Sequence, residues 1–353
     1  MAIEYIGNKT QLVDRMWGAM RGHLREKPKS FADLFCGTAS VSRFMRAQGF
    51  RVTANDSLLL CATFAEASLL TEIPPSFAGL ADAGVLEGPA RRRYAELLQI
   101  LNGLSPIEGF IFRTYSPASL VHGASEARMY FTEKNSGKLD AMRRQIAQWR
   151  PHLTTAEHAF LLVDLVKAAN RVSNIAGTYG CYLKNWKIRA LQPVEVTESQ
   201  LSFSGPMGEV FRQDALDLAA QVDAEVVYAD PPYTKRQYAA YYHLLETLVA
   251  GDEPEVTGST GLRPWGHAAS DFCYRRKAPG ALRDLVRGLR GSPDFFLSYN
   301  EDGQIHHGEI INILGERGKV TVHEFELRRY KSSNLTHKGR QVTERLYHVK
   351  ASD

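Results

Sequence analysis

Few cysteines and the absence of long apolar runs limit what this chain of 353 residues can be. The four cysteines are scattered, without a Cys-x-x-Cys pair and without a histidine at metal-ligand spacing. This argues against a zinc site and a disulfide framework. No apolar run approaches the length of a membrane span, and the first ten residues lack a signal-peptide core. We therefore expect a cytoplasmic protein without membrane contact.

The net charge is also small, +4 at pH 7, and by itself is weak evidence for a nucleic-acid partner. Its position in the chain says more. Residues 312–353 hold nine Lys or Arg and five Asp or Glu, so this segment carries the whole positive excess. A local positive field suits a polyanion, although a solvated basic face would have the same composition.

A complete dinucleotide fingerprint, Gly-x-Gly-x-x-Gly, is missing. The segment FADLFCGTAS, residues 31–40, instead predicts a short strand, a turn of small residues with one glycine, and a helix from Val41 to about Gln48. The incomplete pattern disfavours an oxidoreductase. Small residues still let the backbone approach a ligand, and the N-terminus of the helix adds its positive dipole end.

Asp56 follows a second predicted strand, 51–55, and lies 19 positions after Gly37. An acid at about this distance from the glycine turn can accept hydrogen bonds from ribose hydroxyls. It can also cap the helix that begins at Ser57. The succession of strand, turn, helix, strand and acid favours the ribose role.

Two further segments are weaker signals for ligand contacts. The segment YIGNK, residues 5–9, precedes a helical pattern and can present amide groups and a charge to an anion, although a plain turn explains it more simply. Asp214 stands just past a predicted short strand, 208–213. It could accept a hydrogen bond from an adenine amino group, or cap the helix predicted at 215–220.

The segment that organises the chain is an apolar run, Val226 to Ala229, followed by Asp-Pro-Pro-Tyr at 230–233. It predicts a buried strand closed by a turn. The prolines fix φ and lack N–H groups, so the loop is stiff. A stiff loop can hold a carboxylate, bare carbonyls and a flat ring in one geometry, which an exocyclic amine on a planar heteroaromatic requires. A plain strand-ending turn is the alternative.

Residues 76–200 lack the strand–helix alternation of their flanks. They contain two strongly helical segments, 138–149 and 155–169, and aromatic stretches that include Arg113, Arg128, Lys184 and Lys187. Aromatic residues interleaved with basic ones suit a nucleic-acid surface. An ordinary helical insert with a surface loop is the alternative.

The chain then returns to strands. A helical segment is predicted at 241–249 and a long loop at 253–278, and loops of this length are usually functional or disordered. A basic amphipathic helix at 280–289 and a buried strand at 295–300 follow. Two more strands, 320–327 and 345–349, enclose a basic loop at 328–340.

In this order the motifs resemble those of the Dam-type (alpha-order) DNA N6-adenine methyltransferases. The methionine-end motif comes first, then the glycine turn, the target-recognition region and the catalytic Asp-Pro-Pro-Tyr. The likeness extends to the segments at 236–238, 242–247, 296–300 and 330–331, and so covers nearly the whole chain. One departure is Gly7-Asn8-Lys9, where Gly-Gly-Lys is more usual, and Asn tolerates a left-handed backbone.

The resemblance implies an α/β fold, a doubly wound Rossmann-like methyltransferase sheet of seven strands in which the last two form a hairpin. Residues 1–75 and 201–353 would form the catalytic core, and residues 76–200 an inserted, mainly helical target-recognition region. The methyl donor would be S-adenosylmethionine, and no metal is expected.

The same resemblance assigns roles to individual residues. Asp33 and Gly37 would face the methionine part of the cofactor, Asp56 its ribose and Asp214 its adenine. The catalytic residues would be Asp230, Pro231, Pro232 and Tyr233. The other cofactor contacts would be Tyr5, Lys9, Phe35 and Asp230. DNA contacts are expected from Arg236, Tyr238, Lys184, Lys187, Lys331, Lys338 and Arg340.

The implied reaction begins with a target adenine that leaves the duplex. Asp230 and the carbonyl of Pro231 would accept its N6 hydrogens, and Tyr233 would stack on the base. The expected partner is double-stranded DNA, with a cognate restriction nuclease as a candidate second partner, and a monomer is expected. An RNA N6-adenine methyltransferase and a catalytically inactive DNA-binding relative remain alternatives. A protein-glutamine methyltransferase is disfavoured, because that group resembles Asn-Pro-Pro-Tyr and Asp230 replaces the asparagine here.

Overall fold

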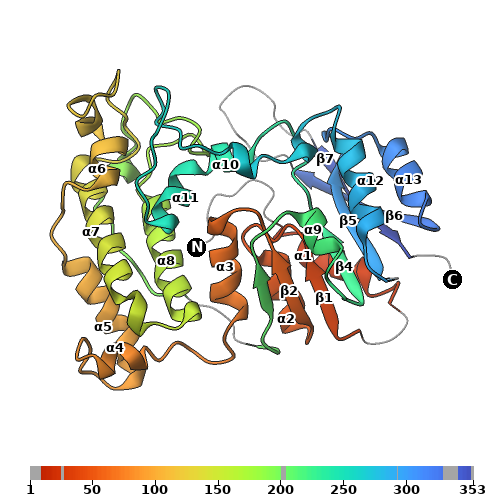
Figure 1. Cartoon of the computed structure of the whole chain (residues 1–353), viewed down its shortest axis with the longest axis horizontal. Coiled ribbons are helices and arrows are strands. Elements are labelled where there is room, and N and C mark those ends of the chain that lie inside the picture. The colour runs from red at the N-terminus through yellow and green to blue at the C-terminus, as the bar shows by residue number, and fades with distance from the viewer. Residues whose placement is uncertain (1–8, 25–27, 200–203, 292, 329–340, 351–353) are drawn as a thin grey trace. The chain divides into compact units, whose positions relative to one another are not determined.

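The computed structural model describes the chain except residues 1–8, 25–27, 200–203, 292, 329–340 and 351–353 (Figure 1). Its contacts divide the chain into two compact units. The sheet unit is formed by Gly7–Ala65, Ser204–Tyr238 and Ala268–Asp353, and the helical unit mainly by Glu66–Phe203 and Ala239–His267. No described helix is long and apolar enough to cross a membrane.

The described residues of the sheet unit form seven strands in the order β3-β2-β1-β4-β5-β7-β6. Strands β1 to β5 are parallel, whereas β7 runs antiparallel to both β5 and β6. The predicted sheet with its terminal hairpin is therefore confirmed. The strands are β1 (Ser30–Asp33), β2 (Arg51–Asn55), β3 (Glu209–Phe211), β4 (Val226–Ala229), β5 (Asp294–Asn300), β6 (Val320–Arg328) and β7 (Gln341–Val349).

Helices cover both faces of this sheet, which is why the central strands are continuous apolar runs. On one face, Val227, Phe295 and Leu297 pack among the apolar residues of α9, α12 and α13. On the other face, Phe31 meets Phe50, and Phe50 meets Trp17 of α1. The helices are α1 (Val13–Met20), α2 (Ser40–Ala47), α3 (Leu59–Leu69, which extends into the helical unit), α9 (Ala215–Ala219), α12 (Ala278–Gly288) and α13 (His307–Gly315).

The helical unit is built around two long helices, α7 and α8, that contact each other. Both begin at threonine caps: Thr132 accepts from Asn135 N–H, and Thr154 forms a reciprocal capping box with Glu157. The helices of this unit are α4 (Ala78–Asp82), α5 (Ala90–Gly103), α6 (Phe110–Tyr115), α7 (Glu133–Trp149), α8 (Thr155–Arg171) and α11 (His243–Ala250), and α10 (Tyr238–Tyr241) links the units in sequence. Short 3₁₀ helices lie at Pro117–Leu120, Arg150–His152, Ile188–Leu191, Gly266–Ala268 and Asp271–Cys273.

The units differ from the predicted segments in one respect. Residues 66–75 and 239–267, expected in the core, group with the helical unit. The reason is tertiary contact: α11 contacts α8, and the Arg143 guanidinium of α7 donates to the carbonyl of Asp252 at 3.1 Å. Arg263 pairs in turn with the Asp252 carboxylate at 2.9 Å.

In the sheet unit, two elements differ most from the sequence-based expectation. Helix α13 was not predicted, because Ile310, Ile311 and Ile313 favour strands as much as helices. Strand β7 begins at Gln341 rather than Arg345, and this longer strand contains Glu344.

Candidate active site

Four predicted acidic residues lie at the carboxyl ends of four neighbouring parallel strands. Asp33 ends β1, and Asp56, Asp214 and Asp230 follow β2, β3 and β4. The strand order reverses between β1 and β4, and open α/β sheets bind ligands at such a switch point, outside the carboxyl ends. The fold thus brings to one edge residues that are 197 positions apart in the sequence.

Asp33 is a buried acid with one unused oxygen. Its Oδ2 accepts a 2.6 Å hydrogen bond from Ser42 Oγ. Its Oδ1 makes no hydrogen bond to the described residues. Burial, with smaller contributions from the charges of Asp230 and Asp56, raises the pKa of Asp33 to about 7. The hydrogen bond from Ser42 lowers the pKa of Asp33, and so does the nearby backbone N–H of Phe35.

The predicted turn of small residues has the backbone expected of it. Gly37 has φ +52° and Ala39, which precedes α2, has φ +57°, both in the left-handed region. The Gly37 N–H donates to Asp56 Oδ2 at 3.0 Å. Phe35 is half-buried at the edge of the turn, with its ring edge-on to Phe272 at 5.5 Å between centroids.

Both acids with a predicted alternative as caps do cap helices. Asp56 Oδ1 accepts from the N–H of Leu58, just before α3, and Asp214 Oδ1 accepts from the N–H of Leu216 in α9. Asn55, which sequence reasoning missed, donates to the carbonyls of Leu34 and Gln213 and so ties two of the strand ends together.

The Asp-Pro-Pro-Tyr loop, residues 230–233, is held at its far end by Tyr233. The ring of Tyr233 is edge-on to Tyr299 of β5, 5.8 Å between centroids, and its carbonyl accepts from Gln304 N–H at 2.8 Å. Pro231 is buried and Pro232 half-buried. The loop is therefore fixed by its prolines and by contacts from the segment after β5.

Lys9 lies beneath this loop, with only 6% of its surface exposed. Its Nζ is 3.1 Å from Asp230 Oδ1 and 2.7 Å from Glu344 Oε1, and 5.5 Å from the centroid of the Tyr233 ring. Lys9 was expected near the cofactor, and the structure places its ammonium between two carboxylates. Glu344 was not predicted as a site residue.

These charges adjust one another. Burial raises the pKa of Asp230 to about 7; Lys9 opposes the shift and Glu344 adds to it. Burial would lower the pKa of Lys9, but Asp230 and Glu344 raise it well above its usual range. Burial likewise opposes ionisation of Glu344, yet Lys9 holds its pKa below the usual value. Lys9 and Glu344 are therefore a charged pair, and Asp230 beside them is a weaker acid than an exposed aspartate.

The predicted DNA contacts have different surroundings. Arg236 is exposed just after the catalytic loop, and Tyr238 is half-buried at the start of α10. In the helical unit Lys184 is exposed, whereas the Lys187 ammonium donates to the carbonyl of Ile175 at 2.6 Å. Tyr5, Lys331, Lys338 and Arg340 lie outside the described residues.

Arg128, one of the basic residues in the aromatic stretch, is not available to DNA phosphate. It is 8% exposed, and its guanidinium donates to the carbonyls of Ser259, Gly258 and Thr114 at 3.0 to 3.2 Å. Arg128 thus fastens the 257–262 turn to the end of α6. The expectation of a nucleic-acid surface does not hold for this residue.

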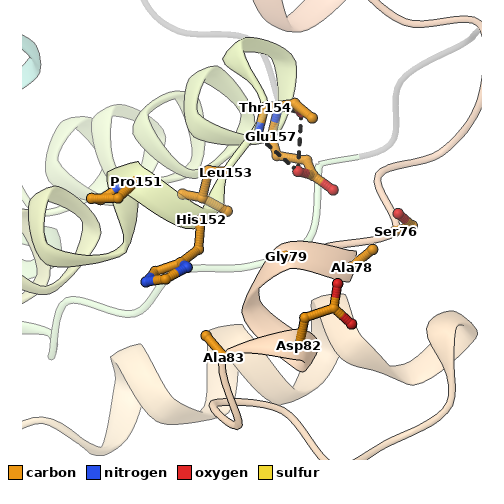
Figure 2. A pocket seen from close by; sticks show the side chains of 10 residues that line it. All are labelled: Ser76, Ala78, Gly79, Asp82, Ala83, Pro151, His152, Leu153, Thr154 and Glu157. Carbon is orange, nitrogen blue, oxygen red and sulfur yellow. Dashed lines mark hydrogen bonds between the residues drawn. The ribbon is translucent and has the colours of Figure 1, made fainter.

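A hollow of about 550 Å³ lies elsewhere, between α4 and the start of α8 (Figure 2). It contains none of the predicted site residues. Its buried acid, Glu157, is already occupied by the N–H groups of Phe77 and Thr154. The lining residues are Ser76, Ala78, Gly79, Asp82, Ala83, Pro151, His152, Leu153, Thr154 and Glu157.

A doubly wound sheet with a small-residue turn after β1 and an Asp-Pro-Pro-Tyr loop after β4 defines a methyltransferase core. Residues 5–287 match the family described as D12 class N6 adenine-specific DNA methyltransferase, and the chain belongs to this family.

Three curated relatives are similar over almost the whole chain. Modification methylase StsI from Streptococcus sanguinis is 32% identical over 98% of this chain, and the type II methyltransferase M.FokI from Planomicrobium okeanokoites is 31% identical over 94%. The chain spans about half the length of these two, 52% and 50%. The type II methyltransferase M.NlaIII from Neisseria lactamica is 31% identical over 98% of both chains.

Proposed function

We propose that this protein transfers a methyl group from S-adenosylmethionine to N6 of an adenine in duplex DNA, at a specific sequence. The observation that carries the proposal is Asp230 at the switch point of the sheet, with the carbonyl of Pro231 and the ring of Tyr233 on the same stiff loop. Family membership and relatives named as modification methylases support it.

The loop residues would act by orientation. Asp230 and the Pro231 carbonyl accept the two hydrogens of the adenine amino group, which turns the nitrogen lone pair toward the methyl donor. Holding reactants in a near-attack geometry is a large contribution to such displacements. Extracting the base from the stack costs a few kcal/mol, and stacking on Tyr233 offsets part of this.

The residues at the neighbouring strand ends fit the proposed cofactor. The unused Oδ1 of Asp33 is a buried acceptor that suits a cationic amino group, and the carboxylate of Asp56, which follows β2 beside the Gly37 turn, suits ribose hydroxyls. Phe35, Gly37 and Asp214 would complete the site. When bound, S-adenosylmethionine supplies a methyl group on a sulfonium, which is already activated for displacement.

DNA recognition is proposed for the inserted region, with Lys184 and Lys187 in contact with the backbone and Arg236 and Tyr238 beside the reacting base. The basic loop with Lys331, Lys338 and Arg340 is proposed to grip phosphate. The names of the relatives support a role in DNA modification, and a cognate restriction nuclease as partner stays a prediction. The monomeric state and the cytoplasmic location stay predictions.

The test is incubation of the protein with methyl-labelled S-adenosylmethionine and either unmodified duplex DNA or total RNA, followed by digestion to nucleosides. We expect label in N6-methyldeoxyadenosine, and sequencing of that DNA would give the target site. Label only in RNA would replace the substrate and keep the chemistry. No label in either, with the cofactor bound, would contradict the proposal.

A further inference from the structure

The last strand of the sheet contributes a buried acid to the surroundings of the catalytic loop. Glu344 on β7 lies opposite Asn300 of β5 and is 2% exposed. Its Oε1 accepts a 2.6 Å hydrogen bond from Ser298 Oγ, and its Oε2 accepts one from Asn300 Nδ2 at 3.1 Å. Two donors from the neighbouring strand thus fix the carboxylate, which lies outside the residues that match the family.

Lys9 connects this fixed acid to the catalytic one. One ammonium serves two carboxylates, the buried Glu344 at 2.7 Å and the half-buried Asp230 at 3.1 Å. A buried ammonium without a partner would cost several kcal/mol. Because Glu344 is held by a strand and Asp230 belongs to a loop, Glu344 is the anchor, and Lys9 transmits its position to Asp230.

We propose that Glu344 is a positioning residue: by anchoring Lys9 it fixes the Asp230 carboxylate and shares the positive charge that would otherwise belong to Asp230 alone. The inference rests on the proposed function, since it concerns how Asp230 accepts the amino hydrogens of the base. Because Lys9 is shared with Glu344, Asp230 is a stronger proton acceptor than it would be if it were the sole partner of this ammonium.

The inference predicts the sign of a pH effect. The charged or titratable groups that face Asp230 are Lys9, Asp33, Tyr228, Tyr233 and Glu344. Removing the negative charge of Glu344 removes one cause that raises the pKa of Asp230. Lys9 then pairs with Asp230 alone, and this also lowers the pKa of Asp230. The pKa of Asp230 then falls, so its ionised form persists to lower pH.

The experiment compares Glu344→Gln with the wild-type protein in kcat and kcat/KM for DNA methylation between about pH 5 and pH 9. We expect the acid limb of the Glu344→Gln profile to move down by about one pH unit. Glu324→Gln is the matched control: it makes the same change in the same hairpin, but Glu324 is paired with Arg345 on the surface. Its profile should superimpose on that of the wild type.

The variant Glu344→Asp separates the effect of the negative charge from the effect of side-chain length. It keeps the negative charge, so the acid limb should stay near the wild-type position, while its shorter side chain holds Lys9 less well and lowers kcat several-fold. A carboxylate that merely stabilised the hairpin would lower activity equally at every pH. Denaturant unfolding of each variant shows whether it is folded under the assay conditions.

A second readout does not depend on activity. The side-chain carboxyl ¹³C resonance of Asp230, assigned by its absence in Asp230→Asn, is titrated in the wild type, Glu344→Gln and Glu324→Gln. We expect a lower midpoint only in Glu344→Gln. An unmoved midpoint in an active enzyme would overturn this inference alone. A folded wild type that methylates no nucleic acid would overturn the proposed function alone, because the titration is still read.

Discussion

The sheet unit and the helical unit each contain a buried aspartate, and they surround it differently. In the helical unit, Asp164 accepts from the hydroxyls of both Tyr94 and Ser199, so both of its oxygens are used. In the sheet unit, Asp33 accepts from Ser42 through Oδ2, while Oδ1 has no hydrogen bond among the described residues. Burial raises the pKa of Asp164 to about 6 and that of Asp33 to about 7.

The difference separates buried polar groups that hold the fold together from those available to a ligand. Asp164 and Arg128 use their hydrogen-bonding capacity on their own unit, and so fasten loops. Asp33 keeps one oxygen without a hydrogen bond among the described residues, and burial raises the pKa values of both Asp33 and Asp230 to about 7, as is common for groups that bind or react. The following variants test this distinction, from the largest expected effect to the smallest.

Asp230→Ala should abolish methylation while S-adenosylmethionine still binds. The loss of a charged acceptor at the reacting amino group should lower kcat by about 10³-fold. The measurement is transfer of labelled methyl to DNA, with cofactor binding followed by calorimetry. Wild-type turnover in this variant would remove Asp230 from the reaction.

Arg128→Ala should destabilise the helical unit without directly changing the methyl-transfer chemistry. Three carbonyls lose a buried charged donor, so the free energy of unfolding should fall by about 3 kcal/mol, measured by urea denaturation. Arg113→Ala, which removes an exposed pair with Glu253, is the control and should change stability by less than about 0.5 kcal/mol. Equal effects would contradict the fastening role of Arg128.

Asp33→Asn should flatten the pH dependence of stability. Because burial raises the folded-state pKa of Asp33 to about 7, the folded protein keeps a proton that the unfolded chain releases near pH 4. Wild-type stability should therefore fall as pH rises from about 4 to about 7, with Asp33 contributing of the order of 4 kcal/mol.

The comparison with Asp164→Asn sharpens this prediction. The pKa of Asp164 is raised only to about 6, so its contribution should be smaller and should end at lower pH. Unfolding free energies measured by denaturant at several pH values decide the matter. A wild-type slope in the Asp33→Asn protein would mean that Asp33 is ionised in the fold.

Tyr233→Ala should weaken turnover by about tenfold, which corresponds to the loss of one base–aromatic stacking contact. Tyr233→Phe keeps the ring and should stay close to the wild type, since stacking does not use the hydroxyl. Single-turnover rates with duplex DNA make the comparison. If the phenylalanine variant were as slow as the alanine variant, the hydroxyl rather than the ring would be the functional part.

The parts of the fold and site that the sequence predicted were encoded locally. The apolar run before Asp230, the small-residue turn at Gly37 and the acid after the second strand each depend on a few adjacent residues, and the structure places all of them at one sheet edge. The topology followed from the order of these motifs through the resemblance.

The parts that were missed depend on distant partners. Lys9 and Glu344 are 335 positions apart, and nothing near Glu344 marks it as different from any polar residue on a hairpin. Asn55 is similar, because its amide bonds the carbonyl of Gln213, 158 positions away. The assignment of 239–267 to the helical unit likewise depends on Arg143, which no local pattern relates to Asp252.

The position of β7 has a consequence for how this protein is made. Strand β7 lies between β5 and β6, yet it is the last of them to leave the ribosome. Until it is synthesised, β5 and β6 have no partner on their facing edges, and Lys9 has no Glu344 to bind. A nascent chain that already contains Asp230-Pro231-Pro232-Tyr233 therefore lacks the strand that anchors Lys9, and the cluster of Asp230, Lys9 and Glu344 is complete only after translation has passed Glu344.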